Sequence, residues 1–411
     1  MGLSVSTPQQ AAERTHLISF DEASRLIALH ARPLGTETVP IEVADRRILA
    51  RPAVSRRQSP VTLVSAMDGY AVRESDLAQL PATLAIAGKS FAGAGFGSAL
   101  PAHGCVRIFT GASAPIGTDR IVMQEDVREG DGVAIFALPL SPRRHLRLAG
   151  SDFREGEILV SAGSILTPQR LIGIAAADLA EVEVFRQPRV AIICCGDELI
   201  EPGHAGQSLD KIPESISFGI AALVRNWGGI ITARRRVPDN LARLQAAALD
   251  AVECADVIVV IGGASVGEKD YAKGAFASLE IEYLFTKVAI RPGKPVWFGR
   301  AGKTLVVGLP GNPSSALVTG RLFLAPLLAG LSGGNASDGL DWRMMRSNAP
   351  VAGCSDRDVF ARATVVARSA VLLLDQDSAS QKALADATHL IRRRSGDLTS
   401  AADALVETLV L

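Results

Sequence analysis

The order of apolar and polar residues changes several times along the chain, and residues 188–331 show the clearest alternation. There, short runs of β-branched and other apolar residues alternate with stretches of helical periodicity. The predicted strands are 190–195, 229–233, 256–261 and 304–307, and the predicted helices are 213–227 and 240–255. Strands that alternate with helices are typical of an α/β domain with a mainly parallel sheet. We therefore predict a central three-layer α/β domain.

Shorter patterns lie on both sides of this region and predict a multidomain α/β and β chain. Runs broken by glycine and proline predict a β-rich inserted domain, and short strands near the end predict a small C-terminal β-barrel-like domain. Two helices, opening after Ser19 with capping-box spacing and after Thr167, are expected to pack side by side in a helical linker domain. The predicted bounds are 17–55 with 147–187 for the linker domain, 56–146 for the inserted domain, 188–331 for the α/β domain and 338–411 for the C-terminal domain.

A stiff loop follows the last strand of the α/β domain. Pro310 and Pro313 each fix φ near about −65°, and Asn312 is suited to the N-cap of a helix that starts at Pro313. Free N–H groups of the first helical turn, near Ser314 and Ser315, would point out of the carboxyl end of the strand. Such a turn is a ready-made anion site.

Composition narrows the classes of partner and compartment. The 411 residues are 48% hydrophobic and 21% charged with a formal net charge of +0, so bulk charge recruits neither nucleic acid nor an anionic membrane. Five cysteines without metal-ligand spacing indicate a reducing compartment and no zinc site. Because we find neither a leader pattern nor eighteen uninterrupted apolar residues, we expect a cytoplasmic protein without a membrane partner.

Two further loops at the same sheet edge carry polar groups. Asp197 and Glu198 follow the first strand and suit Mg²⁺, although the tetrapeptide alone favours a solvated turn with a capping aspartate. The glycine-rich loop 262–271 contains Ser265 and Asp270. Its N–H groups suit an oxyanion, and a plain tight turn explains it equally well.

A basic loop places Lys287, Arg291 and Lys294 around a Pro-Gly turn. Prolines on both sides hold Arg291 and Lys294 in fixed directions, which suits a small oxyanion better than a merely solvated surface.

Other polar or reactive residues receive structural interpretations. Asp239 precedes a helix and, taken alone, is interpreted as its N-cap. The arginine runs 234–236 and 392–394 are interpreted as solvated faces. Cys194 and Cys195 are expected in the sheet core as small hydrophobic residues.

The order of motifs in the chain resembles the molybdopterin molybdotransferase family, also called the MoeA family, which includes the E domain of gephyrin. The matching motifs are Ser-Ala-Met-Asp-Gly-Tyr-Ala (65–71), Thr-Gly-Ala (110–112) with Val-Met-Gln-Glu-Asp (122–126), Gly-Asp-Glu-Leu (196–199), Gly-Gly-x-Ser-Val-Gly-x-x-Asp-Tyr (262–271), Arg-Pro-Gly-Lys-Pro (291–295) and Gly-Leu-Pro-Gly-Asn-Pro-x-Ser (308–315). Each motif is modest evidence, but together and in this order they are specific.

This resemblance implies a homodimer of four-domain subunits that converts adenylylated molybdopterin and molybdate into molybdenum cofactor and AMP, with Mg²⁺. It implies functional roles for the matching positions, which are Asp68, Thr110, Asp152, Glu198, Asp239 and Asp270 for catalysis; Ser265, Lys287, Arg291, Lys294, Pro310, Asn312, Pro313 and Ser315 for substrate or molybdate; and Asp197, Glu198 and Asp270 for the metal. Molybdopterin adenylyltransferase and molybdoenzymes become candidate partners.

The sequence also departs from the family pattern, and other functions stay open. The departures are Leu63, Val64, Ser151, Ile216, Asn240 and Arg291; among them, Ile216 replaces an amide near the expected pterin site. One alternative is a catalytically reduced paralogue that carries molybdopterin or finished cofactor without releasing AMP. Another is a scaffold that engages a partner peptide. A third, an adenylyl transferase of the related α/β fold, matches only about 188–330.

Overall fold

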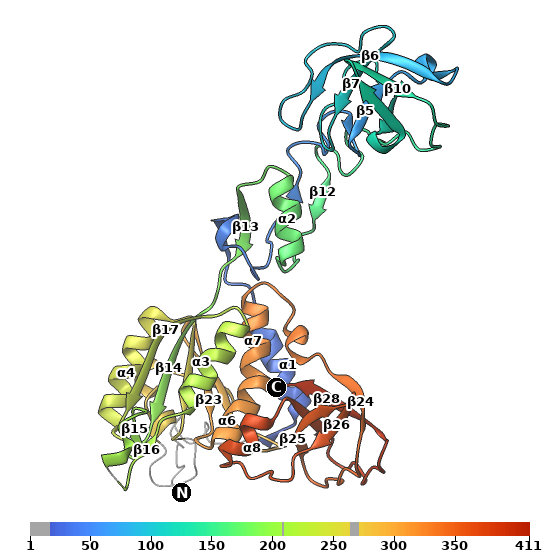
Figure 1. The fold of residues 1–411 in the computed structure, drawn as a ribbon. Helices are drawn as coiled ribbons and strands as arrows, with labels where there is room; N and C mark the ends of the chain where they lie inside the picture. Colours follow the sequence, from blue (N-terminus) through green and yellow to red (C-terminus); the bar gives the residue numbers. More distant parts are fainter. Residues whose placement is uncertain (1–16, 208, 264–270) are drawn as a thin grey trace, which may run out of the picture. The chain divides into compact units, whose positions relative to one another are not determined.

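The computed structural model describes residues 17–207, 209–263 and 271–411 and divides them into two compact units (Figure 1). The larger unit contains residues 17–37 and 185–411, and the inserted unit contains residues 38–184. Each has its own buried apolar clusters.

A six-stranded sheet forms the centre of the larger unit. Its strands, in spatial order, are β17 (Ile230–Val237), β14 (Arg189–Cys195), β18 (Val257–Ile261), β23 (Thr304–Leu309), β22 (Trp297–Ala301) and β19 (Glu282–Phe285). The first four run parallel, and β22 and β19 add antiparallel strands at one edge. The sheet is therefore mainly parallel, as its alternating pattern predicts.

Apolar side chains of the sheet alternate between two cores. Val190, Ile192 and Cys194 lie in one cluster, whereas Ala191 and Ile193 lie in the other. Helices that supply the first cluster are α1 (Phe20–His30), α3 (Ile216–Asn226), α6 (Pro313–Thr319) and α7 (Ala325–Leu331); those that supply the second are α4 (Leu241–Cys254) and the short α5 (Tyr271–Gly274). Helices thus cover both faces of the sheet.

The helix after Ser19 begins as predicted but packs elsewhere. The Ser19 side chain accepts a hydrogen bond from the Glu22 N–H at 3.1 Å, as a capping box requires. Its apolar face, which includes Phe20 and Ile27, belongs to the α/β core and contacts α7. The expected pairing with the helix after Thr167, α2 (Pro168–Ala176), is wrong, because Ile174 of α2 lies in a separate core of the inserted unit.

One continuous helix, residues 313–331, runs through the main core. It consists of α6, a π-helical turn at Gly320–Leu324 and α7. It is long and apolar enough to cross a membrane, with mean hydropathy 1.4, but 94% of that stretch is buried inside the protein. Burial among α1, α3 and the sheet is the behaviour of a core helix.

The end of the chain closes into a five-stranded barrel, which agrees with the predicted β-barrel-like domain. Strands in order around it are β25 (Asp358–Val366), β26 (Ser369–Leu372), β24 (Arg343–Ser347), β28 (Leu405–Val410) and β27 (His389–Arg393), and β27 pairs back with β25. The short strand β21 (Ile290–Arg291) joins the outer edge of β25, and α8 (Gln381–Asp386) precedes β27.

The inserted unit contains a six-stranded sheet and a smaller body. The strands of the sheet, in spatial order, are β8 (Arg120–Met123), β5 (Gly69–Val72), β7 (Gly104–Ile108), β6 (Ala82–Ser90), β10 (Val133–Phe136) and β9 (Val127–Gly130). The smaller body contains α2 and the strand pairs β2 (Thr36–Pro40) with β13 (Glu181–Phe185) and β3 (Ala53–Val54) with β12 (Ile158–Val160).

Short strand pairs and 3-10 turns complete the fold. The pairs are β1 (Leu17–Ile18) with β20 (Lys287–Val288), β4 (Val64–Ser65) with β11 (Leu146–Arg147) and β15 (Leu199–Ile200) with β16 (Ile212–Pro213). The 3-10 turns are Ile41–Val43, Glu74–Leu77, Gln124–Asp126, Ala205–Gln207, Ala277–Leu279 and Ala336–Leu340.

The arginine run 392–394 is not the solvated face that the sequence suggested, whereas the run 234–236 is exposed, as predicted. Arg392 is only 6% exposed, forms an ion pair with Asp358 at 2.7 Å and lies over the Phe20 ring. Arg234 pairs with Glu201 and with the buried Glu214. Only the run 392–394 is corrected, because the buried Arg392 pairs with Asp21 and Asp358, which lie far away in the sequence.

Gly308 offers a test of packing in the main sheet. A Cβ at this position would lie 1.9 Å from the Trp297 indole, which is fully buried. We expect Gly308→Ala to lower the free energy of unfolding by about 1–3 kcal/mol, measured by urea denaturation.

Gly219 provides the matched control, because a Cβ there meets no atom within 4 Å in helix α3. Gly219→Ala should stabilise by up to about 1 kcal/mol. Equal denaturation midpoints for the two variants would contradict the packing argument.

Candidate functional site

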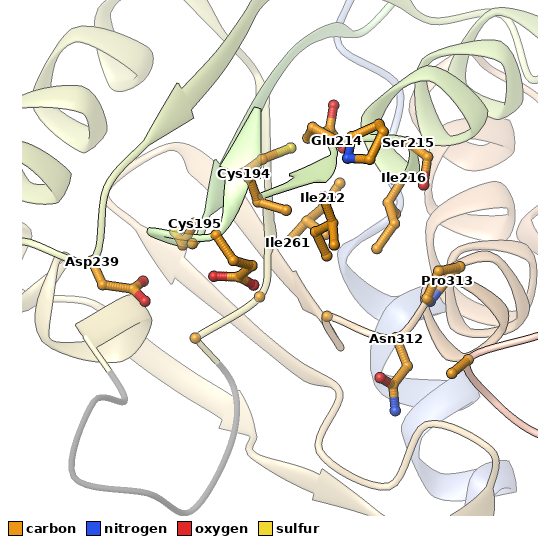
Figure 2. A pocket seen from close by; sticks show the side chains of 18 of the residues that line it. Cys194, Cys195, Ile212, Glu214, Ser215, Ile216, Asp239, Ile261, Asn312 and Pro313 are labelled. Atoms are coloured by element: carbon orange, nitrogen blue, oxygen red, sulfur yellow. The ribbon is translucent and has the colours of Figure 1, made fainter. Parts of the chain in front are cut away.

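A cavity of about 810 Å³ opens at the carboxyl edge of the parallel strands in the larger unit (Figure 2). It is lined by the strand ends, the turn before α3, the basic loop and the proline loop. Two residues that follow the barrel strand β26 also line it. Its lining includes Cys194, Cys195, Gly196, Glu198, Leu199, Asp239, Ile261, Gly262, Gly263, Lys287, Lys294, Pro295, Ala379, Gln381 and residues 212–216 and 311–313. Residues from the predicted loops at the strand ends thus line a single cavity.

Two predicted acids, Glu198 and Asp239, line this cavity from neighbouring strand ends. Asp197 joins them through its Oδ1, which accepts the backbone N–H of Asp239 at 3.1 Å. The interpretation of Asp239 as a helix cap is wrong, since Asn240 occupies the N-cap of α4 and its side chain accepts the Arg243 N–H at 3.0 Å. Asp239 lies instead at the edge of the cavity.

Glu214 is a lining residue that the sequence motifs did not single out as functional. Its side chain is nearly buried, accepts the Ser217 backbone N–H at 2.8 Å and pairs with Arg234 at 3.3 Å. The spacing to Ser217 is the signal that was available in the sequence, because an acid three residues before a helical N–H is a capping arrangement. Glu214 therefore holds the start of α3 against the cavity.

Basic residues also line the cavity, but only two of the three predicted ones do so. Lys287 and Lys294 line the cavity. Arg291 is exposed in β21, where it pairs with Val359 of the barrel, and is not among the lining residues. Its proposed role in anion binding stays a prediction.

The proline loop forms as predicted, with Asn312 at the N-cap position and Pro313 first in the helix. Both line the cavity, whereas Pro310 and Ser315 are buried outside the lining. The Asn312 side chain makes no capping bond and instead donates to Ser378 Oγ at 3.1 Å.

The first turn of this helix is covered by the barrel segment 375–381. The Ser314 N–H donates to the Ser378 carbonyl at 3.0 Å. Arg362, 1% exposed, donates to Ser314 Oγ and to the carbonyls of Asp375 and Asp377 at 3.1 and 2.9 Å. The helix start is therefore partly occupied by this segment, and its anion-binding capacity is smaller than the sequence suggested.

The middle of the cavity is apolar. Figure 2 shows Ile212, Ile261 and Ile216 between Asp239 at one end and Asn312 with Pro313 at the other. Cys194 and Cys195 are buried, as predicted, and burial raises the pKa of the Cys195 thiol to about 12. A neutral apolar wall of this kind suits the face of a planar ring.

Inserted-unit residues form a separate polar group. The backbone N–H and the hydroxyl of Thr110 both donate to Asp68 Oδ1 at 2.7 Å, and these bonds lower the pKa of Asp68. Asp152 and Ser151 are exposed, whereas Val64 is buried in β4. The two hydrogen bonds from Thr110 thus hold the Asp68 carboxylate in a fixed orientation.

Two of the predicted site residues, Ser265 and Asp270, lie outside the described residues. Within the described part of the chain, no group of three or more His, Cys, Asp or Glu side chains is arranged to hold a metal ion. The carboxylates of Asp197 and Glu198 would need further ligands from water or a phosphate to bind Mg²⁺, which is the usual arrangement for that ion.

Comparisons with known proteins find two family matches along the chain. Residues 18–177 match the family described as MoeA N-terminal region (domain I and II), and residues 191–330 match a probable molybdopterin binding domain. Among curated relatives, a molybdopterin molybdenumtransferase of Haemophilus influenzae is 39% identical over 319 residues, 77% of this chain and 78% of that protein. One of Nostoc is 35% identical over 338 residues, 80% of this chain and 76% of that protein.

A solved structure is similar over nearly the whole chain. The molybdopterin biosynthesis moea protein from Pyrococcus horikosii has a TM-score of 0.80 at 27% identity, and the match covers 96% of this chain and 99% of that one. The architecture therefore recurs at low sequence identity.

Asn240 offers a test of the corrected cap. Asn240→Ala should lower the free energy of unfolding by about 1 kcal/mol, because the first turn of α4 loses a side-chain acceptor. Asn240→Asp restores an equivalent acceptor and should change stability little. If chemical denaturation shows the same loss for both variants, the side-chain cap is not what stabilises this turn.

Proposed function

The chain belongs to the molybdopterin molybdenumtransferase family, and we propose that it inserts molybdate into adenylylated molybdopterin and releases AMP. The relatives' names favour this transferase over a carrier, a scaffold or an adenylyl transferase. A cytoplasmic location belongs to the same proposal.

The observation that carries the proposal is the division of one cavity into charged and apolar parts. Glu198 and Asp239 supply carboxylates, Lys287 and Lys294 supply cations, and Ile212 and Ile216 supply an apolar wall. A volume of about 810 Å³ is in the range of small-molecule sites. A substrate with a planar pterin, phosphates and an incoming oxyanion needs these three surfaces together.

The lysines are the groups suited to molybdate. A dianion leaves water only where charged donors replace its hydration, and an ammonium gives short, charge-assisted hydrogen bonds. Because the Ser378 carbonyl already accepts the Ser314 N–H, the helix start contributes less to this capture than the lysines.

Mg²⁺ fits the carboxylate side of the cavity. Glu198 and Asp239 line it and Asp197 lies beside Asp239, a donor set of hard oxygens that suits this ion when substrate phosphate completes its coordination. Bound there, the ion would neutralise charge that develops on phosphate oxygens as the adenylate leaves. The carboxylates would orient it and leave the lysines to the anion.

Three further parts of the proposal are supported by the match of motifs. They are homodimerisation, the participation of Asp68, Thr110 and Asp152 in the reaction, and roles for Ser265 and Asp270 of the glycine loop. Among these residues the structure adds one contact, the double hydrogen bond from Thr110 to Asp68. Molybdopterin adenylyltransferase and molybdoenzymes remain proposed partners.

The proposed reaction is tested by AMP release from the purified full chain. With adenylylated molybdopterin and Mg²⁺, we expect AMP to appear only when molybdate is added, and chelation of the metal should abolish it. Retention of the adenylate without AMP release, under the same conditions, would contradict the transferase and leave a carrier.

Substitutions in the basic loop test whether Lys294 or Arg291 binds the molybdate. Lys294→Gln should raise the molybdate concentration for half-maximal AMP release about tenfold or more, because it removes a charged donor at the cavity. Arg291→Gln should have a smaller effect, since Arg291 lies at the barrel edge. An equal or larger effect of Arg291→Gln would place that side chain in the oxyanion site.

A further inference from the structure

The inserted unit carries a ladder of four planar groups on one face of its sheet. The Arg107 guanidinium carbon lies 4.9 Å from the Tyr70 ring centroid and 5.1 Å from that of Phe109. Phe109 in turn stacks on Phe91, with centroids 4.6 Å apart and planes 8° from parallel. The ladder therefore runs from Tyr70 through Arg107 and Phe109 to Phe91.

The ladder is held in place by backbone and side-chain bonds. Tyr70 and Arg107 are register partners in β5 and β7, and Arg107 also donates to the Gly69 carbonyl at 3.2 Å. The Phe109 N–H donates to the Ser90 carbonyl at 3.1 Å, next to Phe91. A rigid set of rings loses little conformational entropy when it binds a ligand.

Hydrogen bonds also fix the turn that carries Phe91, the outermost ring. Phe91 and Ala94 exchange two backbone hydrogen bonds of 3.0 Å, which close a tight turn. Ser90 Oγ donates to the Ser113 carbonyl at 2.9 Å and ties this turn to the one that follows Phe109. Phe91 nevertheless remains 46% exposed, so the ladder ends at an accessible ring.

Charged groups accompany that ring. Lys89 is the register partner of Arg107 on β6, is exposed, and forms no ion pair with the residues that the structure describes. Thr110 follows Phe109 directly and donates twice to Asp68. An ammonium and a polar turn thus lie beside the stack, as a heterocycle that carries phosphate would require.

We propose that Phe91 is a stacking platform for a planar nitrogen heterocycle, with Lys89 placed to attract its phosphate. This inference rests on the proposed function, since adenylylated molybdopterin carries two such heterocycles, the adenine and the pterin. A base stacks on an aromatic side chain without needing a specific pattern of hydrogen bonds. The Arg107 cation on the inner side of Phe109 attracts the ring electrons and so fixes the stack from within.

The experiment measures ligand binding to the full chain by calorimetry. Wild type, Phe91→Leu and Phe91→Trp are each titrated with AMP, with ribose 5-phosphate and with a pterin that lacks adenylate. Leucine keeps an apolar side chain but has no ring face, so Phe91→Leu should weaken AMP or the pterin about tenfold and leave ribose 5-phosphate unchanged. Tryptophan should retain the affinity. Which ligand responds identifies the heterocycle.

Phe218 provides the matched control, because it is 44% exposed and Arg234 lies 3.9 Å above its ring in the larger unit. Phe218→Leu should bind all three ligands as wild type does. Unchanged affinities in Phe91→Leu, within a protein that releases AMP, would overturn the platform and leave the transferase intact. If Phe91→Leu weakens heterocycle binding but the wild-type protein releases no AMP, the platform is kept and the transferase is contradicted.

Two further results would also overturn the platform. An equal loss of ribose 5-phosphate in Phe91→Leu would assign the ring a structural role. A change of oligomeric state in Phe91→Leu, seen by sedimentation with unchanged ligand affinities, would assign Phe91 to a contact between protein chains.

Discussion

The larger unit depends on the burial of the helix 313–331, because a helix inside a core must find partners for the polar groups at its ends. Its start is satisfied from the barrel, by the Ser378 carbonyl and by Arg362 on Ser314 Oγ. Midway, Arg321 donates to the carbonyls of Val410 and Gly339, and burial lowers its pKa to about 10. Since either arginine would be costly to bury without these acceptors, helix and barrel stabilise each other.

The same constraint reduces the number of free N–H groups that the helix start offers to the cavity. A free helix start at the end of a strand would offer several N–H groups and a favourable dipole to an oxyanion. Here the barrel segment takes the Ser314 N–H, while Ala379 and Gln381 from that region line the cavity. The barrel region therefore contributes to the wall of the cavity, and the basic side chains in the described lining are Lys287 and Lys294.

Local sequence signals predicted most of the helices and strands. The features that they did not predict depend on residues far away in the sequence. Strands 190–195 and 256–261 and the helix start at Pro313 depend on nearby residues and were predicted. The sequence assigned the N-cap of α4 to Asp239 instead of the neighbouring Asn240, because either side chain suits a cap. Only the fold decides which of the two faces the cavity. The buried position of Arg392 depends on Asp21 and Asp358, which lie far away in sequence.

Residue 216, where the family pattern has asparagine, is an isoleucine in the apolar part of the cavity. In the sequence it removes a hydrogen-bonding group; in the structure Ile216 joins Ile212 and Ile261 between the two polar ends. A site divided in this way orients a substrate that is apolar in its ring and charged at its phosphate, since each part is desolvated only against a matching wall. Ile216 is therefore part of the apolar wall, in the same cavity that Glu198, Asp239, Lys287 and Lys294 line.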